Sequence, residues 1–302
     1  LKGFLDWRLH VVEDLGGPKC FLDIGFGVLD AAVEGSALTL QVGGSEFFGE
    51  YYQALGMHEA LETDGADLLF SNRIDRFVVN AKTFQSIPRN PFAYWISKSL
   101  LDAFASQPRV EDRFLVLSGG NPRDDFRFIR HWAEAPQNNS KDFVPYSKGG
   151  EFSSYYYDVH LMLKWKNDAK ELKVQAASYR ENLGWSPDWR ALMMNYDYYF
   201  SPGITWPRRT SRLSFRFLPK GCVFGDKSPV ILSQDGNHSS LTSLIGYLNT
   251  LGFNDAVSLM VGSSELAQSF EVGIVKSCPL PKMDRNGPVS YTHLTLPTNR
   301  EV

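Results

Sequence analysis

Near the middle of the chain lies the stretch Phe143-Val144-Pro145-Tyr146-Ser147-Lys148-Gly149-Gly150-Glu151-Phe152, which mixes aromatic, hydroxyl, cationic and glycine residues. Further polar and aromatic segments follow at residues 163–168 and 195–210. A protein interior does not need a run such as Lys-Gly-Gly-Glu or Thr-Trp-Pro-Arg-Arg. Backbone amides, lysine and hydroxyl groups suit phosphate contacts, and aromatic rings stack on bases. These segments therefore predict a surface that holds a nucleic acid.

The composition indicates a packed protein with a local basic strip. The chain has 302 residues, of which 43% are hydrophobic and 22% charged, so one large domain or two ordinary ones are expected. The net charge of −3 argues against a protein that coats nucleic acid by charge alone. Five cations nevertheless fall close together with almost no acid between them: Arg208, Arg209, Arg212, Arg216 and Lys220.

The cysteines and histidines give no sign of a metal site. Cys20, Cys222 and Cys278 are far apart and form no Cys-x-x-Cys pair, so neither zinc nor a disulfide framework is expected. The histidines show no ligand spacing. No apolar run is long enough to span a bilayer, and no signal-peptide pattern is present. We therefore predict a reducing, cytoplasmic location and no membrane partner.

Both ends of the sequence are unusual. The chain starts at Leu1 instead of Met, and its first residues are typical of the middle of a helix, so we expect a fragment of a longer protein. Residues 283–302 have no periodicity, and we expect them to be a non-native tail.

Hydrophobic periodicity predicts a mixture of helices and strands. We expect a short helix running into a strand at residues 4–15, helices at 92–105 and 171–181, and a helix pair at 241–260 that breaks near Gly252. Residues 51–63 are interpreted as a polar helix or loop, and 118–122 as a turn. Residues 20–24 are expected to be a strand or an extended entry. Strands are expected at 33–42, 76–79, 114–117, 215–218, 222–224 and 270–275, with 215–218 and 222–224 paired to each other.

Two motifs in the first part of the chain leave alternatives open. Residues 23–27, Asp-Ile-Gly-Phe-Gly, allow an S-adenosylmethionine loop with Glu46 on the ribose, or a plain strand connection, which the missing third glycine favours. Residues 89–92, Arg-Asn-Pro-Phe, superficially resemble the Asn-Pro-Pro-Tyr motif of amino-methyltransferases. The second proline is absent, and a helix start is the favoured interpretation.

The candidate DNA contacts lie in three segments. Lys148, Arg208 and Arg209 are the strongest candidates because lysine and arginine bind phosphates, and arginine reads guanine edges. In the segment 118–123, Ser-Gly-Gly-Asn-Pro-Arg, a loop approaching phosphate and a solvated turn are equally favoured. Trp206 is also interpreted as a core residue. The further candidates are Tyr146, Ser147, Gly149, Gly150, Asn121 and Trp206.

The order of several motifs resembles one family. These motifs are the Pro-x-x-Pro-x-x-Tyr-Trp-x-Ser pattern at 88–97 and the runs at 144–152, 164–168, 198–206, 270–275 and 279–281. Together they resemble the C-terminal half of large adenine-specific DNA methyltransferases. These enzymes form the PglX-like group of BREX phage defence, which is related to type II restriction enzymes. The resemblance covers roughly residues 20 to 281.

The resemblance implies an α/β chain with two functional parts. Residues 1–83 would be the C-terminal remnant of a Rossmann-like methyltransferase sheet, and 84–282 a mixed α+β target-recognition domain. The full enzyme would transfer a methyl group from S-adenosylmethionine to adenine in double-stranded DNA. Its cofactor loop and catalytic motif would precede this chain, which alone would be inactive.

Two alternatives remain open beside this interpretation. One is a non-catalytic DNA-recognition subunit that works with other restriction-modification or phage-defence subunits. The other is a self-contained methyltransferase built on residues 23–27.

Overall fold

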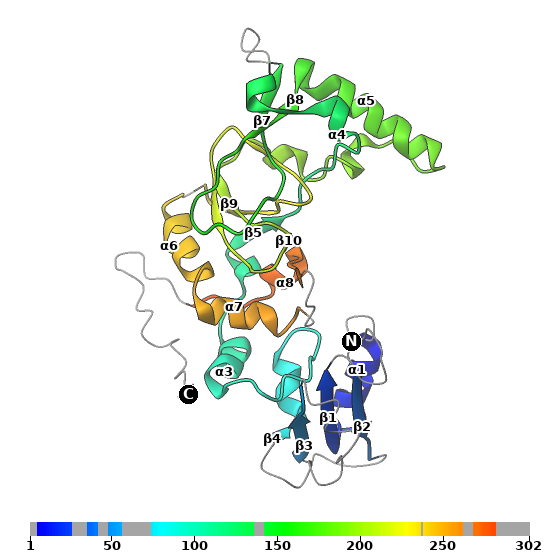
Figure 1. Cartoon of the computed structure of the whole chain (residues 1–302), viewed down its shortest axis with the longest axis vertical. Helices are drawn as coiled ribbons and strands as arrows, with labels where there is room; N and C mark the ends of the chain where they lie inside the picture. Colours follow the sequence, from blue (N-terminus) through cyan, green and yellow to red (C-terminus); the bar gives the residue numbers. More distant parts are fainter. Residues whose placement is uncertain are drawn as a thin grey trace. The chain divides into compact units, whose positions relative to one another are not determined.

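The chain forms two compact units in a computed structural model, Leu1–Ser106 and Gln107–Val302 (Figure 1). The structure describes residues 5–25, 35–41, 48–55, 74–135, 142–236, 238–261 and 268–281. The expected tail at 283–302 lies outside these ranges. The units divide later in the chain than the domain boundary expected near residue 84, and the functional assignment of the two parts stays a prediction.

The first unit is built on a mixed four-stranded sheet in the order β2-β1-β3-β4. Strand β1 (Cys20–Gly25) runs parallel to β3 (Phe48–Gln53) and antiparallel to β2 (Gly35–Thr39), and β3 pairs antiparallel with β4 (Asp75–Asn80). The other elements of this unit are α1 (Leu5–Glu13), the 3₁₀ helix η2 (Ala81–Ser86) and α3 (Lys98–Ser106).

Aromatic side chains make the core of the first unit. Phe21 of β1 and Tyr51 of β3 are buried together with Phe84, Phe92 and Tyr94, and the Tyr51 and Tyr94 rings stack with centroids 5.3 Å apart. Aromatic pairs at this spacing add to the stabilisation from burial. The sheet and the segment after it are thus joined by one core.

Three sequence predictions for this unit were wrong. Residues 51–53 belong to strand β3, because Tyr51 fills the core and the strand pairs on both sides, whereas residues 56–63 lie outside the described ranges. Helix α3 begins at Lys98, since the apolar residues before it enter the aromatic core from a loop. Strand β2, expected to be buried, is a half-exposed edge strand.

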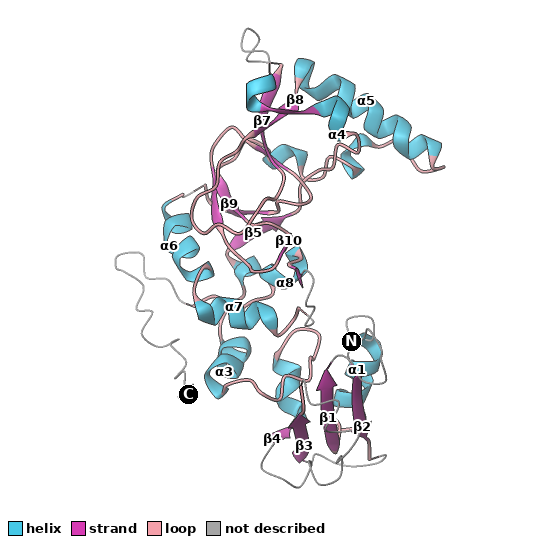
Figure 2. Cartoon of the chain, viewed as in Figure 1, coloured by secondary structure: helices cyan, strands magenta, loops and turns pink. Residues whose placement is uncertain are grey.

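The second unit contains two four-stranded sheets (Figure 2). The first, in the order β11-β9-β13-β5, is antiparallel throughout; its strands are β5 (Phe114–Leu117), β9 (Gly203–Thr205), β11 (Arg216–Leu218) and β13 (Val230–Ser233). The second has the order β12-β7-β8-β6, with strands β6 (Ile129–His131), β7 (Phe143–Ser147), β8 (Leu161–Lys164) and β12 (Val223–Phe224). The short strands β10 (Arg209–Thr210) and β14 (Gln268–Ser269) form a separate pair.

Helices cover the sheets of the second unit. The α-helices are α4 (Asp125–Phe128), α5 (Lys166–Asn182), α6 (Ser239–Leu248), α7 (Leu251–Ser258) and α8 (Val272–Lys276). Helix α6 contacts β9 and β13, and α8 contacts β5. The 3₁₀ helices are η3 (Val110–Asp112), η4 (Trp132–Glu134), η5 (Trp189–Ala191) and η6 (Tyr196–Tyr198). In the described ranges, no helix is long and apolar enough to cross a membrane.

Several predictions for the second unit are confirmed and two are wrong. The strand at 114–117, the helix at 171–181 and the helix pair at 241–260 are all present, with the break at Asn249 and Thr250. Strands β11 and β12 exist but belong to different sheets, because β12 pairs in parallel with β7. The strand predicted at 270–275 is largely helix α8, whose Ile274 and Val275 are buried in the unit.

Candidate nucleic-acid interface

Three segments far apart in the sequence converge on the turn Gly225–Ser228, which joins β12 to β13. Asp226 N donates to Gly120 O at 3.1 Å, and Gly225 N donates to Ser147 O at 2.9 Å. Arg208 N donates to Lys227 O at 3.0 Å. The structure therefore brings the three candidate segments, near residues 121, 148 and 208, to one place. Their contact with DNA stays a prediction.

Buried hydroxyl groups hold this turn against both sheets. Ser228 Oγ lies 2.6 Å from Ser147 Oγ of β7 and 2.7 Å from Thr205 Oγ1 of β9. Thr205 Oγ1 also donates to Pro229 O at 2.7 Å. Such a network is stabilising only when every buried group has a partner. Ser147, a candidate for phosphate contact, thus serves as a buried link instead of an exposed donor.

The glycines Gly149 and Gly150 have conformations that other residues rarely adopt. Their φ angles are +82° and +121°, which favour glycine over residues with a side chain. A Cβ on Gly150 would lie 2.8 Å from the Tyr157 ring, and one on Gly149 would lie 3.0 Å from Lys227 O. Both glycines therefore allow close packing of the loop, which places Gly149 against the backbone of Lys227.

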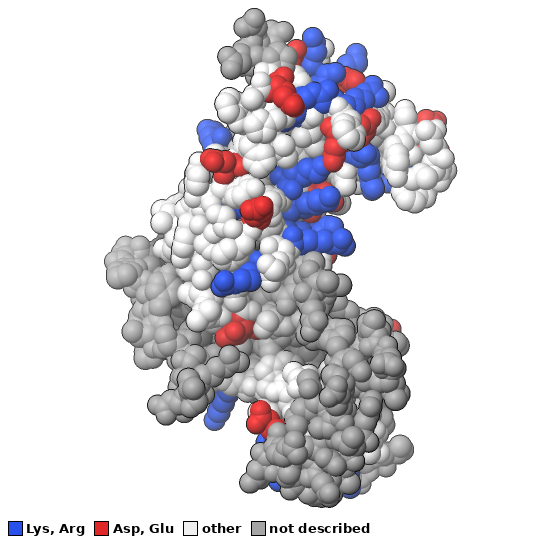
Figure 3. Space-filling model, in the orientation of Figure 1, with Lys and Arg blue, Asp and Glu red and all other residues white. Residues whose placement is uncertain are grey.

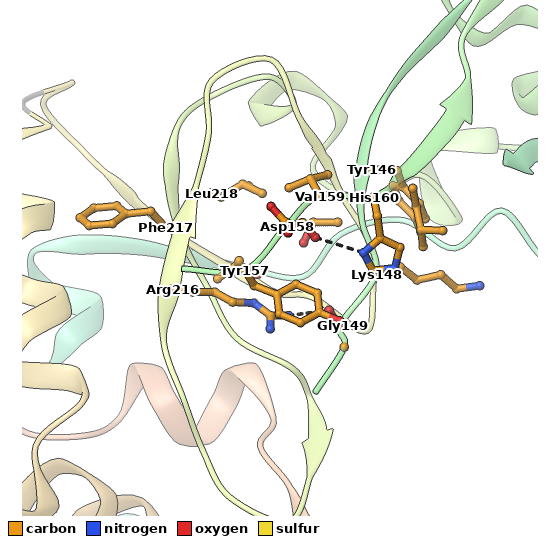
Figure 4. Close-up of a pocket in the computed structure, with 14 residues that line it drawn as sticks. Tyr146, Lys148, Gly149, Tyr157, Asp158, Val159, His160, Arg216, Phe217 and Leu218 are labelled. Atoms are coloured by element: carbon orange, nitrogen blue, oxygen red, sulfur yellow. Dashed lines mark hydrogen bonds between the residues drawn. The ribbon is translucent and has the colours of Figure 1, made fainter. Parts of the chain in front are cut away.

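A buried arginine, Arg216 of β11, fixes the backbone of the same loop (Figure 4). Its guanidinium donates to Glu151 O at 3.1 Å and to Gly149 O, and it lies 4.1 Å from the Tyr157 ring centroid. Only 2% of Arg216 is exposed, and burial lowers the pKa of its guanidinium. The sequence placed Arg216 in a basic strip, but burial makes it a structural clamp.

The clamp borders a small cavity of about 80 Å³ beneath the loop, lined in part by Tyr157, His160 and Leu218. Figure 4 shows the Lys148 side chain extending away from Arg216 and Tyr157. The loop thus has an inner side held by Arg216 and an outer side that carries Lys148.

The three strongest candidate cations differ in their surroundings. Lys148 forms an ion pair with Asp125, and 17% of its side chain is exposed. Arg208 is partly buried, with its Nε 3.9 Å from Glu271 Oε1 and no hydrogen-bond partner for that Nε in the described residues. Arg209 is exposed on the strand pair β10–β14. Only Arg209 of the three thus presents an exposed cation.

The sequence interpretation missed Lys227, an exposed cation within the turn itself. Its backbone contacts Gly149 and Arg208, so it lies between two candidate segments. The run Gly-Asp-Lys-Ser-Pro at 225–229 carried the signal, because it is a turn between two apolar strands.

Lys and Arg side chains gather along one side of the second unit, from α4 and α5 to the level of β10, with Asp and Glu between them (Figure 3). We call the basic face the set of cations that adjoin the turn Gly225–Ser228 or α4: Arg123, Arg127, Lys148, Arg208, Arg209 and Lys227. Phosphate groups contact surfaces of this kind.

Two aromatic candidates are buried and have no face available for a base. Tyr146 is 2% exposed, its hydroxyl donates to Gly120 O at 3.4 Å, and burial raises its pKa well above the ordinary value. Trp206 is fully buried and donates from Nε1 to Phe270 O at 2.9 Å. Both rings therefore support the loops around the turn Gly225–Ser228 from within the core.

The segment 118–123 is a packed loop with a polar outer side. A Cβ on Gly119 would lie 1.9 Å from Phe224 O, and one on Gly120 would lie 2.7 Å from Tyr199 Oη. Close packing thus accounts for both glycines. Asn121 Nδ2 donates to Asp226 Oδ2 at 3.3 Å, and Asn121 Oδ1 accepts from Arg123 N at 2.9 Å. Asn121 thereby fixes the turn and orients the first cation of the basic face.

In the described residues, the two motifs of the first unit show no second site. Residues 26–34 and Glu46 lie outside the described ranges, so the loop at 23–27 is described only as far as Gly25. Asp23 accepts a hydrogen bond from Tyr94 at 3.0 Å. Asn90 and Phe92 are buried, and Phe92 packs in the aromatic core. Phe92 therefore has no free ring for an extruded base.

Comparison with known proteins finds similar proteins both in sequence and in structure. The chain is 27% identical over 208 residues to the adenine-specific methyltransferase BrxX of Escherichia coli O9:H4 (strain HS), a match that covers 66% of this chain and 16% of that protein. It is 25% identical over 232 residues to the adenine-specific methyltransferase PglX of Lacticaseibacillus casei (strain Zhang), covering 72% and 18%. No protein-family model matches the chain.

The structure is similar to that of the type IIL restriction-modification enzyme MmeI in complex with DNA. The TM-score is 0.51 at 13% identity, with 90% of this chain and 36% of that chain covered. This likeness shows a mixed α/β fold with several sheets, of the kind found in restriction-modification enzymes.

The chain spans less than a fifth of the length of the curated relatives that it matches. The relatives confirm the resemblance predicted from the order of the sequence motifs. The chain is similar in sequence to the adenine-specific methyltransferases BrxX and PglX, and similar in fold to a type II restriction-modification enzyme.

Proposed function

We propose that this chain contributes DNA target recognition to a site-specific adenine DNA methyltransferase. The whole enzyme would transfer a methyl group from S-adenosylmethionine to the exocyclic amine of an adenine that is extruded from the duplex. Residues 84–282 would select the DNA sequence, and residues 1–83 would be the end of a Rossmann-like catalytic domain. The cofactor loop and catalytic residues would belong to the part of the relatives that this chain does not match.

The observation that carries the proposal is the convergence on the turn Gly225–Ser228. Segments chosen from the sequence as DNA contacts meet there, and each carries a cation close to the turn: Arg123, Lys148 and Arg208. The backbone beneath these cations is rigidly bonded through Arg216, Ser228 and Thr205. Cations on a fixed scaffold lose little entropy when they bind phosphate, which favours DNA as the partner.

Binding of duplex DNA at several salt concentrations tests the proposal. We expect Arg209→Ala and Lys227→Ala each to weaken binding and to reduce the slope of log K against log salt by about 0.9 for each phosphate contact that the substitution removes. The control is Arg113→Ala, because Arg113 is an exposed cation just before β5, at the opposite end of that strand from Gly120.

A smaller slope in the two basic-face variants alone would support the basic face as a phosphate contact. Absence of duplex binding by the unaltered chain, or equal slopes for all three variants, would contradict it.

The second candidate function is a non-catalytic DNA-recognition subunit of a restriction-modification or phage-defence complex. It makes the same prediction for the basic face, so DNA binding does not separate the two. Reading the genomic DNA upstream of Leu1 does: an in-frame Asn-Pro-Pro-Tyr motif favours the methyltransferase, and a start codon immediately upstream favours the subunit.

A further inference from the structure

Phe126 is the most exposed large apolar side chain in the described part of the chain. Its exposed fraction is 95%, against 76% for Leu251 and 68% for Tyr156, the next in order. Leaving a phenylalanine in water forgoes roughly 1.5–3 kcal/mol of burial free energy. Single exposed apolar residues are common on protein surfaces, so exposure alone does not identify a site. The backbone under Phe126 and the charges around it supply the further observations.

The backbone that carries Phe126 is held at several points. The side chain of Asp124 caps helix α4 by accepting from Arg127 N at 3.1 Å, and Phe128 is fully buried in the core of the second unit. Arg130 Nη1 donates to Phe126 O. One side of this short helix is therefore anchored, while the ring of Phe126 projects into solvent.

Two cations flank Phe126 in the sequence, Arg123 and Arg127, and both are exposed. The Arg123 guanidinium lies 5.2 Å from the Tyr179 ring centroid, and the Arg127 guanidinium is 2.8 Å from Glu171 Oε1. The acidic neighbour Asp125 is paired with Lys148, so its charge is balanced within the basic face. An apolar ring among cations is suited to a partner that has phosphates outside and flat apolar rings inside.

We propose that Phe126 is a wedge that inserts into the base stack of duplex DNA when the basic face contacts the phosphates. Proteins that bend or open DNA use apolar side chains in this way, and they offset the unstacking cost with added contacts. Arg123 and Arg127 would hold the phosphates on either side of the opened step. This inference rests on the proposed function, because it requires DNA on the basic face.

Duplex affinity of the full chain, with three substitutions, tests the wedge. We expect Phe126→Ala to weaken binding roughly 5- to 150-fold, the range expected for one base–aromatic stack. The salt slope should stay unchanged because every phosphate contact is kept. Phe126→Trp should keep the affinity, since indole also stacks. The control is Leu251→Ala, which removes another highly exposed apolar side chain, on α7, and should bind like the unaltered chain.

A duplex with one mismatched pair gives a second readout, because the mismatch lowers the cost of opening the stack. The unaltered chain should prefer it to the matched duplex, and Phe126→Ala should lose this preference. If the unaltered chain binds no duplex, the proposed function and the wedge both fail. If it binds and Phe126→Ala keeps either the same affinity or the same mismatch preference, the wedge alone is overturned.

Discussion

Replacing Arg216 by methionine tests whether a buried cation holds the loop of residues 148–151 in shape. Methionine keeps an unbranched apolar side chain but removes the hydrogen bonds to Gly149 O and Glu151 O and the contact with the Tyr157 ring. Two backbone carbonyls of the loop then lose the hydrogen bonds that Arg216 donates to them. We expect a marked loss of stability of the second unit.

The magnitude follows from these contacts. A hydrogen bond from a charged donor contributes roughly 1.5–3 kcal/mol, and a desolvated cation–π contact about 2 kcal/mol. Part of this is recovered, because Gly150 and Glu151 are exposed and water reaches the loop. Methionine is uncharged, so folding of the variant also avoids the desolvation cost of burying the Arg216 guanidinium. The net loss in free energy of unfolding is therefore about 2–4 kcal/mol, which lowers the midpoint of a unit of this size by roughly 5–15 °C.

Differential scanning calorimetry at neutral pH measures this shift. The matched control is Arg212→Met, four residues earlier, where the guanidinium is exposed and lies 4.8 Å from the Phe152 ring centroid. A surface change of this kind should alter stability by about 0.5 kcal/mol or less. Equal midpoints for Arg216→Met and the unaltered chain, or equal losses for the two variants, would refute the clamp.

Two further changes probe the same unit. Gly150→Ala should unfold at a lower temperature than Gly221→Ala in calorimetry: both glycines have positive φ, but only at Gly150 would the Cβ meet a neighbour, the Tyr157 ring at 2.8 Å. Equal decreases in the unfolding temperature of the two variants would show that the Tyr157 ring moves away from the new Cβ at no cost in stability. Asp168→Asn should destabilise the chain at neutral pH, since the hydrogen bond from Lys173 lowers the pKa of Asp168 below its ordinary 3.8. A carboxylate whose pKa is lowered by folding stabilises the folded state at pH values above its ordinary pKa of 3.8, and this stabilisation is lost as the pH falls. The unfolding midpoints of the variant and the unaltered chain should therefore converge well below pH 3.8. A difference that stays constant with pH would contradict this.

Local sequence patterns predicted the helices and strands correctly where the buried residues are the apolar residues of the pattern. The strand at 114–117 is a short apolar run that ends at a glycine turn, and the helix pair breaks at Asn249 and Thr250, where Thr250 caps α7 by accepting from Phe253 N. The segment 270–275 has strand-forming residues, yet it is mostly helix because Ile274 and Val275 pack on one side of α8. Tertiary packing overrides propensity in such short segments.

The sequence indicated which segments make up the candidate site, but it did not indicate which of their residues are buried supports and which are exposed. Arg216 and Arg212 look alike in the sequence, but β11 turns Arg216 and Leu218 inward and leaves Phe217 40% exposed. No local pattern predicts that a charged residue takes the buried side of a strand while an aromatic one takes the exposed side. Lys227 was missed for a similar reason, because its importance arises from three segments that meet only in the folded chain.

The residues around the turn Gly225–Ser228 are of two kinds, buried residues with hydrogen-bond partners and exposed cations, and the two kinds are interspersed along the sequence. Arg216, Ser228 and Thr205 have buried partners, so changing them costs stability whether or not DNA is present. Arg209 and Lys227 are exposed, so changing them costs little stability and acts on whatever binds outside. Stability and binding should therefore respond to different substitutions within the same few residues. If the proposed function holds, substitutions of the exposed side chains would change the DNA target while the buried scaffold stays folded.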